Sequence, residues 1–165
     1  MKSDPDGWRI DAAKGSGKPI GCGHVDPLLT ADTLEKMVCT CLEALEAHKD
    51  NFDCIAVTGY SSTIIGAIVA GQLGKNINIV RKDDENSHSP WSVEGAVGVR
   101  YIFIDDLVAS ARTLKRVHEK MKLMQCKLYG VYLYLSGEYH RGTEARLESE
   151  TELGVKFLNS PLDNA

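Results

Sequence analysis

Residues 99–113 read VRYIFIDDLVASART, and this stretch is the most informative part of the sequence. Its apolar first half predicts a strand, which ends in two adjacent carboxylates, Asp105 and Asp106. The small and hydroxyl-bearing residues that follow indicate a short loop and then the first turn of a helix. Because the first amide groups of a helix have no partner within it, such a turn can bind an anion. The order of these features predicts a ligand site in which a diol faces the aspartates and a phosphate faces the loop.

Strands and helices alternate on both sides of this stretch. The first helix is expected to begin with Asp32 and Glu35 as a capping box, and the polar segment 81–98 reads as a lid or a loose hairpin. The predicted elements are, in chain order, a helix at 32–48, a strand at 53–58, a helix at 64–73, strands at 76–80 and 99–104, a helix that ends near 124, a strand at 128–135, a helix at 143–152 and a strand at 155–158. This alternation favours an α/β fold with a mostly parallel sheet and helices on both faces.

Composition sets bounds on the kind of protein. A chain of 165 residues, 43% hydrophobic and 25% charged, is long enough for one well-packed domain, which we expect to span residues 1–165. The formal net charge of -4 and the scattered basic residues argue against a nucleic-acid partner. No apolar run reaches the roughly 20 residues that cross a bilayer, and the first residues lack a signal-peptide core. We therefore expect a cytoplasmic protein without a membrane partner.

The cysteines predict neither a disulfide framework nor a metal site. There are five, an odd number without a repeated spacing, so reduced thiols are expected. Cys39 and Cys41 lie two positions apart in a predicted helix and therefore on different faces, where they cannot easily share a metal. Cys22 and His24 have no second ligand pair nearby, which favours ordinary packing over zinc binding.

Three predicted strands end in residues that suit ligand chemistry: the turn at 58–63, the Arg81-Lys82 pair and the segment 105–113. In a doubly wound sheet, ligands bind beyond the carboxyl ends of the strands, so we expect these segments at one edge. Hydroxyls and amides of the turn could bind an anion or cap a helix. The basic pair could face a charged ligand or only solvent, and the aspartates could hold a diol or only end the strand.

An apolar strand followed by Asp105-Asp106, a small loop with Ser110 and then Arg112-Thr113 resembles the phosphoribosyl pyrophosphate motif of the type I phosphoribosyltransferases. The adenine-type enzymes look most similar here. The resemblance covers about 52–135 and implies a single α/β domain with this core, in which both chain termini form a cap that selects the base. It assigns the ribose phosphate to Asp105, Asp106, Ala109, Ser110, Ala111, Arg112 and Thr113.

The same resemblance implies roles for the other two strand ends. Family members bind pyrophosphate at the turn after the first sheet strand and at an Arg-Lys pair, which here are Thr58, Gly59, Tyr60, Ser61, Ser62, Arg81 and Lys82. The expected catalytic residues are Asp105, Asp106, Arg81 and Lys82. Segment 83–98 takes the place of the family's mobile catalytic loop, in which the expected lid residues are His88, Trp91 and Glu94.

The implied activity is transfer of the ribose 5-phosphate of phosphoribosyl pyrophosphate to a nucleobase with release of pyrophosphate, as in purine or pyrimidine salvage. The implied cofactor, Mg²⁺, would bind through the pyrophosphate, with Asp105 or Asp106 as its only candidate protein ligand. The implied partners are phosphoribosyl pyrophosphate, a nucleobase or nucleotide, and a second copy of the chain in a homodimer. Hypoxanthine-guanine enzymes place an acid where this chain has Ala109, which disfavours 6-oxopurines; no residue identifies the base itself.

Several positions depart from the family pattern. Ser110-Ala111 stands where members usually have Thr-Gly, Arg112 where a second glycine is frequent, and Glu85 where orotate-type loops carry a lysine. These differences keep open a second hypothesis, a non-catalytic protein of the same fold that senses a nucleotide or a ribose phosphate. A third hypothesis is a flavodoxin-like domain whose acidic pair binds a metal alone.

Overall fold

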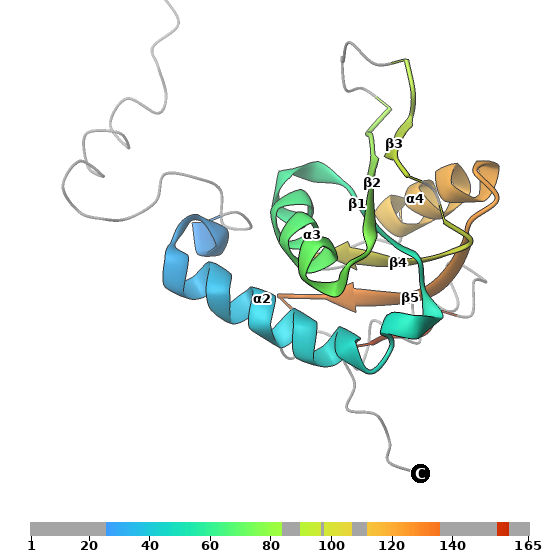
Figure 1. The fold of residues 1–165 in the computed structure, drawn as a ribbon. Helices are drawn as coiled ribbons and strands as arrows, with labels where there is room; N and C mark the ends of the chain where they lie inside the picture. Colours follow the sequence, from blue (N-terminus) through green and yellow to red (C-terminus); the bar gives the residue numbers. More distant parts are fainter. Residues whose placement is uncertain (1–25, 84–89, 97, 107–111, 136–154, 159–165) are drawn as a thin grey trace, which may run out of the picture.

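The computed structural model describes residues 26–83, 90–96, 98–106, 112–135 and 155–158. These residues form a five-stranded sheet with the strand order β3-β2-β1-β4-β5 (Figure 1). The strands are β1 (Cys54–Val57), β2 (Asn76–Val80), β3 (Val93–Gly95), β4 (Arg100–Asp105) and β5 (Lys127–Leu133). Neighbouring strands are parallel except for β2 and β3, which are antiparallel. The predicted mostly parallel sheet is confirmed.

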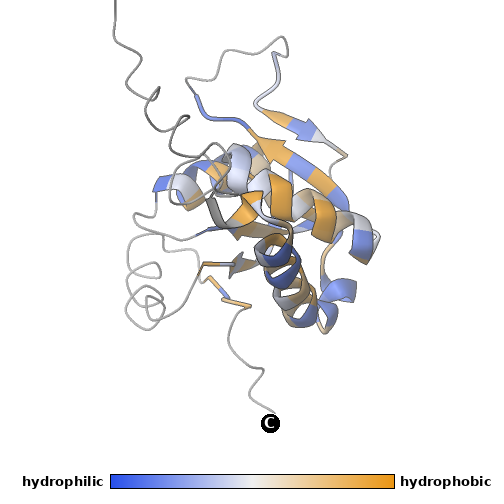
Figure 2. Ribbon diagram, turned by 90° about the vertical axis from the view of Figure 1, so that its left-hand side faces the viewer, coloured by the Kyte–Doolittle hydropathy of each residue, from blue (hydrophilic) through white to orange (hydrophobic). Residues whose placement is uncertain are grey.

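The central strands are buried on both faces. Every residue of β1 is buried, and β4 is buried from Tyr101 to Asp105. Strands buried on both faces read as continuous apolar runs rather than as alternating ones, which is why the sequence located them well. Figure 2 shows the resulting separation, with hydrophobic residues concentrated in the central strands and hydrophilic residues on outer helix turns.

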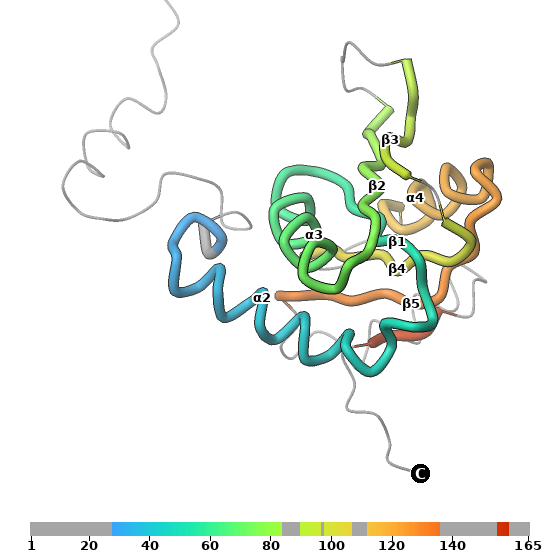
Figure 3. Tube along the Cα trace, viewed as in Figure 1, coloured from blue at the N-terminus to red at the C-terminus, as the bar shows by residue number. Residues whose placement is uncertain are grey.

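Helices cover both faces of the sheet. Helices α2 and α3 pack on one face and α4 packs on the other, as the tube trace shows (Figure 3). The helices are α2 (Ala31–Glu46), α3 (Gly59–Leu73) and α4 (Arg112–Leu123), with short 3-10 turns η1 (Asp26–Leu29) and η2 (Lys49–Asn51). None of these described helices is long and apolar enough to cross a membrane.

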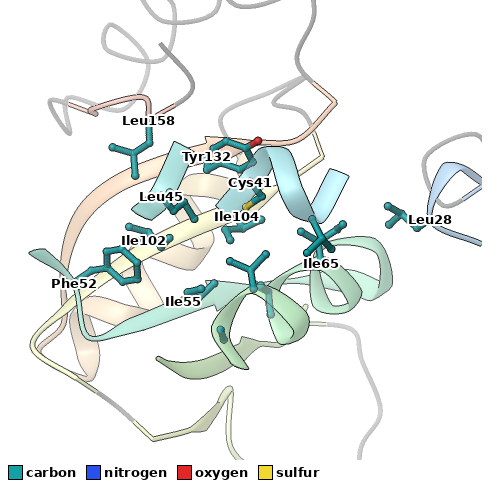
Figure 4. Close-up of a cluster of buried hydrophobic side chains, with 14 residues drawn as sticks. Leu28, Cys41, Leu45, Phe52, Ile55, Ile65, Ile102, Ile104, Tyr132 and Leu158 are labelled. Carbon is teal, nitrogen blue, oxygen red and sulfur yellow. The ribbon is translucent and has the colours of Figure 1, made fainter. Parts of the chain in front are cut away.

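Alternate residues of β4 serve the two layers of the core. Ile102 and Ile104 pack with α2 and α3 in the cluster drawn in Figure 4. Tyr101 and Phe103 point to the opposite face and pack with α4. Because both faces of this strand are covered, the carboxyl end of β4 has a fixed position relative to α3 and α4.

Asp53, just before β1, fixes where β4 begins. Its Oδ2 accepts hydrogen bonds from the backbone N–H of Arg100 at 2.8 Å and of Val99 at 2.9 Å. These hydrogen bonds, that from Arg100 above all, hold the pKa of the Asp53 carboxyl below its ordinary value. Cys54 therefore pairs with Tyr101, and β1 and β4 run in register toward the same edge of the sheet.

Helix α3 approaches β1 closely at Gly66. A β-carbon built on Gly66 would lie 2.4 Å from Cγ1 of Val57, which is closer than two non-bonded carbon atoms can approach. Only a residue without a side chain fits this contact unless Val57 moves. The contact holds α3 directly against the strand that precedes it.

The start of α2 differs from the prediction. Thr30, with an extended backbone, is the N-cap residue, and its carbonyl accepts the N–H of Leu34 at 3.0 Å. Asp32 lies one residue inside the helix instead of forming a capping box with Glu35. The predicted capping box is therefore wrong, although an acidic residue in the first turn still favours the helix dipole.

The turn predicted after β1 is instead the first turn of α3, which begins at Gly59. The polar residues of this turn interrupt the apolar periodicity that marks the rest of the helix, so the sequence placed the helix start too late. Within segment 81–98, the structure contains β3, which pairs with β2. Segment 81–98 therefore returns to the sheet as the second strand of a β2–β3 hairpin, and its role as a lid stays a prediction.

The C-terminal elements are described only in part. The strand predicted at 155–158 consists of an isolated bridge between Phe157 and Val131 in β5. The helix predicted at 143–152 lies outside the described residues, as do the N-terminal and C-terminal segments expected to form the cap. The single-domain organisation with a base-selecting cap stays a prediction.

Candidate functional site

The acidic pair lies at the carboxyl end of β4. Asp105 is the last residue of the strand, and Asp106 follows it directly. The Asp105 side chain is buried, and its Oδ1 accepts hydrogen bonds from the Ser62 hydroxyl at 2.6 Å and from the Asp106 amide at 3.0 Å. Since Ser62 belongs to the first turn of α3, this contact joins the end of β4 to the helix that follows β1.

The backbone of the acidic pair is held from the side of β5. The Tyr134 N–H donates to the Asp105 carbonyl at 3.1 Å, and the Leu135 N–H donates to the Asp106 carbonyl at 3.0 Å. The pairing of β4 with β5 thus continues past the ends of both strands. The two carboxylates therefore sit on a backbone with a defined geometry, as a binding site requires.

Burial raises the pKa of Asp105 to about 7, and the neighbouring charge of Asp106 adds to the increase. The hydrogen bond from Ser62 acts in the opposite direction because it stabilises the ionised carboxylate. Near neutral pH, Asp105 therefore exchanges between its neutral and ionised forms. A ligand that brings hydroxyl donors or positive charge to this edge would favour the ionised form.

The first turn of α3 is open and uncapped. Thr58 is the N-cap residue, but its side chain makes no capping hydrogen bond to the helix. Gly59 has a φ of +75°, a conformation that favours glycine, and a β-carbon on it would meet no atom of the described chain within 4 Å. Tyr60 beside it is 87% exposed. An uncapped helix start of this kind is a ready binding site for an anion.

Arg81 and Lys82 follow β2 at the same edge of the sheet. The Arg81 Nη2 donates to Oε2 of Glu94 at 2.8 Å, across the pair of β2 and β3. The Arg81 carbonyl accepts a hydrogen bond of 2.6 Å from Nζ of Lys120, which also pairs with Asp83 at 2.6 Å. Helix α4 therefore holds the turn after β2 in place, and Glu94 compensates the charge of Arg81.

Two residues that sequence reasoning missed also lie at this edge. The hydroxyl of Tyr134 is buried near Ser61 and Ser62 without a hydrogen-bond partner among the described residues, and burial raises its pKa. The Nη2 of Arg116 lies 3.5 Å from Oγ1 of Thr58, and its Nε is buried without a partner in the part of the chain that the structure describes. The rule on strand ends could have found Tyr134, because it follows a fourth parallel strand. No sequence signal marks Arg116, which reads as an ordinary polar residue of an amphipathic helix.

The remaining predicted residues are placed as follows. Arg112 and Thr113 open α4, and Trp91 is 70% exposed just before β3. The predicted residues outside the described part of the chain are Ala109, Ser110, Ala111 and His88. The loop of the ribose-phosphate site and the middle of the lid therefore stay predictions, as do the roles assigned to all of these residues.

The described residues contain no group of three His, Cys, Asp or Glu side chains that would hold a metal. Asp105 and Asp106 fit another arrangement, in which one or two protein carboxylates share Mg²⁺ with the phosphates of a ligand. The donor set at this edge thus suits a cation that arrives with its ligand.

Neither a protein-family model nor a curated protein matches the sequence, whereas solved structures match the fold. The adenine phosphoribosyltransferase from Thermoanaerobacter pseudethanolicus gives a TM-score of 0.58 at 18% identity, over 81% of this chain and 82% of that one. The orotate phosphoribosyltransferase from Aeropyrum pernix gives a TM-score of 0.64 at 15% identity, over 80% and 72% of the two chains. The adenine phosphoribosyltransferase from Saccharomyces cerevisiae, solved with adenine and an imino-altritol bisphosphate, gives 0.60 at 16% identity, over 81% and 83%.

These similarities show that the chain has a fold of the type I phosphoribosyltransferase kind. The resemblance inferred from residues 99–113 is confirmed at the level of the fold. The flavodoxin-like alternative is set aside.

Proposed function

We propose that this chain, which has the type I phosphoribosyltransferase fold, transfers the ribose 5-phosphate of phosphoribosyl pyrophosphate to a nucleobase and releases pyrophosphate. The observation that carries the proposal is the hydrogen bond between Ser62 and Asp105, which brings the acidic pair and the uncapped start of α3 to one edge of the sheet. A diol-binding group beside an anion-binding group suits the two adjoining parts of this substrate, the ribose and the pyrophosphate.

Asp105 and Asp106 would hold the ribose ring. Their carboxylate oxygens accept hydrogen bonds, and the 2′ and 3′ hydroxyls of the ribose donate them. The 5′-phosphate would bind the loop at 107–111 and the first turn of α4, where Arg112 and Thr113 lie. As the anomeric carbon gains positive, oxocarbenium-like character, the negative carboxylates would stabilise it.

The pyrophosphate would bind the first turn of α3, from Thr58 to Ser62. Arg81 and Lys82 would add positive charge from the end of β2. The bond from the anomeric carbon to the pyrophosphate oxygen breaks and leaves its electron pair on that oxygen, while a ring nitrogen of the base forms the new bond to the carbon and releases its proton to water. Cations and amides placed in advance would lower the barrier because they need no reorganisation, and holding both reactants adds a proximity effect.

Segment 83–98 would close over the reacting carbon and exclude water. Its proposed lid residues are His88, Trp91 and Glu94. β3 anchors the return of this segment to the sheet, and the pair of Arg81 with Glu94 links it to the proposed pyrophosphate site. Because Glu94 of this segment pairs with Arg81, closure of the segment would be coupled to the binding of a negative charge at Arg81.

Mg²⁺ fits this site as a cation shared between the pyrophosphate and the carboxylates of Asp105 or Asp106. When bound, it would neutralise part of the charge on the leaving pyrophosphate. The orientation of the ribose and of the pyrophosphate would come from the residues at the ends of β1, β2 and β4.

Adenine and orotate are the first bases to test, because the solved structures of this fold include adenine and orotate phosphoribosyltransferases. Ala109, where hypoxanthine-guanine enzymes have an acid, argues against 6-oxopurines. We propose that both chain termini form the cap that selects the base. We further propose that the protein acts as a cytoplasmic homodimer in purine or pyrimidine salvage.

Pyrophosphate release tests the proposal directly. The full chain is incubated with phosphoribosyl pyrophosphate and Mg²⁺ and with adenine, orotate, uracil, hypoxanthine or guanine in turn. We expect release with at least one base other than hypoxanthine and guanine, and none without a base. The absence of release with every base would count against transferase activity.

The acidic pair gives a second test, because its removal should affect binding and not folding. We expect Asp105→Asn combined with Asp106→Asn to weaken the calorimetric affinity for ribose 5-phosphate about tenfold or more, since charged hydrogen bonds to two hydroxyls are lost. Asp32→Asn combined with Asp50→Asn removes the same charge from two exposed positions and serves as the control. Equal affinity of the acidic-pair variant and wild type would sink the assignment.

A non-catalytic sensor of a nucleotide or a ribose phosphate is the second candidate. The observation that favours it is the pairing of Arg81 with Glu94, which already compensates one of the two cations proposed to face the pyrophosphate. Glu85, where orotate-type loops carry a lysine, points the same way. Saturable binding of phosphoribosyl pyrophosphate without product in the release assay would decide for this candidate.

A further inference from the structure

Helix α4 brings two further cations to the ends of β1 and β2. Arg116 and Lys120 are four positions apart, so their side chains extend from the same face of the helix. Lys120 reaches the end of β2, where it donates to the Arg81 carbonyl. Arg116 reaches the end of β1, where its Nη2 lies 3.5 Å from Oγ1 of Thr58. Both contacts lie on the edge of the sheet that carries the acidic pair.

Arg116 differs from Arg81 and Lys120 in having no direct ion pair among the described residues, although its charge helps to lower the pKa of the Asp83 carboxyl. Arg81 pairs with Glu94, and Lys120 pairs with Asp83. Among the described residues, no carboxylate lies within ion-pair distance of Arg116. Its Nε is buried and has no hydrogen-bond partner there either. A guanidinium carries five N–H donors, and a buried donor without a partner costs free energy that a bound anion would offset.

The surroundings of Arg116 suit an anion with several oxygens. Its neighbour Thr58 is the N-cap residue of α3, and the Thr58 side chain makes no capping hydrogen bond to that helix. A β-carbon on Gly59 would meet no atom of the described residues within 4 Å of this helix start. The planar fork of a guanidinium matches the oxygen pairs of a phosphoryl group, and the first amides of a helix bind the same group.

We propose that Arg116 binds the pyrophosphate part of the ligand from the side of α4, facing the turn that carries Arg81 and Lys82. The assignment deepens the proposed function and rests on it, because the ligand class is taken from that proposal. Lys120 has a different role: it positions the turn that carries Arg81 and Lys82 through its contacts with the Arg81 carbonyl and with Asp83. The pyrophosphate would thus be enclosed from β1, β2 and α4.

Calorimetry with three ligands tests the assignment: pyrophosphate with Mg²⁺, phosphoribosyl pyrophosphate with Mg²⁺, and ribose 5-phosphate. We expect Arg116→Met to weaken the first two affinities roughly ten- to hundredfold, the range for a lost charged hydrogen bond, and to leave that for ribose 5-phosphate within about threefold. Lys115→Met is the matched control, because it removes an exposed positive charge from the preceding position of the same helix. This control should leave all three affinities unchanged.

The outcomes separate the two proposals. If wild type binds none of the three ligands, the proposed function fails and the Arg116 assignment fails with it. If wild type binds them and Arg116→Met binds them equally well, or loses all three affinities to the same degree, only the Arg116 assignment fails. Should Arg116→Met not fold, Arg116→Lys, which keeps the charge but not the fork, should bind pyrophosphate severalfold more weakly than wild type; unchanged affinity would overturn the assignment.

Discussion

At the scale of single residues, Asp105 meets opposing demands from stability and from binding. Burial and the charge of Asp106 raise its pKa to about 7, whereas an aspartate in an unfolded chain has a pKa of about 3.9. The folded chain therefore holds this proton more tightly than the unfolded chain does. The stability that the protonated carboxyl contributes is present at low pH and is lost as the pH rises from about 4 to above 7. Such a carboxyl is expected where binding rather than stability requires it.

Asp105→Asn should remove this pH dependence and keep an oxygen that accepts from Ser62. We expect the variant to be more stable than wild type at about pH 8 and nearly equal below about pH 4, because wild type loses up to about 1.4 kcal/mol per pH unit between about pH 4 and pH 7. Urea unfolding at a series of pH values measures the two curves. Parallel curves for the variant and wild type would contradict the raised pKa.

Asp53→Asn is a control of opposite sign. Hydrogen bonds from Arg100 and Val99 lower the pKa of Asp53, so its stabilising contribution is present above about pH 4 and is lost as the pH falls below that value. The variant should be less stable than wild type at neutral pH, and the difference should shrink in acid. A difference that grows in acid would contradict the sign of this shift.

The sequence predicted functional residues where a local pattern marks them. Asp105 and Asp106 were predicted because two carboxylates interrupt an apolar strand, and the structure places them at that strand's end. Arg116 was not predicted, because its significance depends on its contact with Thr58. Contacts between residues far apart in the chain leave no periodic signal.

At the scale of elements, α3 joins the packing of the core to the site. Its middle packs against β1 at Gly66, and its first turn supplies Ser62 to the acidic pair and carries the amides proposed to bind an anion. The hydroxyl of Thr63 turns back to the Gly59 carbonyl at 2.6 Å within the same turn. A shift of this helix would therefore displace the proposed pyrophosphate site relative to the acidic pair.

Gly66→Ala tests this close contact. The added methyl group would lie 2.4 Å from Cγ1 of Val57, so we expect a loss of about 1–3 kcal/mol in the free energy of unfolding, as for other overpacked cores. Gly71→Ala is the matched control, because a β-carbon there meets nothing within 4 Å and alanine is the better helix former by up to about 1 kcal/mol. Equal effects of the two substitutions in urea unfolding would contradict the packing described for α3 and β1.

Burial explains in part which helices and strands were predicted accurately. β1 and β4 were predicted to within one residue at each end, because strands covered on both faces are mostly apolar. β2 was predicted to the residue although only Asn78 and Val80 of its five residues are buried. β3 was not predicted as a strand, since only Val93 of its three residues is buried. The first turn of α3 was read as a turn because its residues are polar and face the site rather than the core.

At the scale of the whole molecule, the candidate site is a product of the strand order. Neighbouring β2, β1 and β4 run parallel, so the Arg81 turn, the first turn of α3 and the acidic pair reach one edge although they are far apart in the sequence. Structures that share only 15–18% of their residues with this chain have the same fold. Buried strands and the motif at 99–113 were therefore sufficient to predict the architecture, whereas the residues that would select a base lie in segments without a pattern.

A crystal structure of the complex with phosphoribosyl pyrophosphate and Mg²⁺ is the most direct measurement of the central claim. We predict difference density for the ribose at Asp105 and Asp106, and density for the pyrophosphate at the first turn of α3 between Arg81 and Arg116. With the ligand at a concentration that calorimetry shows to be saturating, density elsewhere on the molecule, or ribose density away from the acidic pair, would contradict the account.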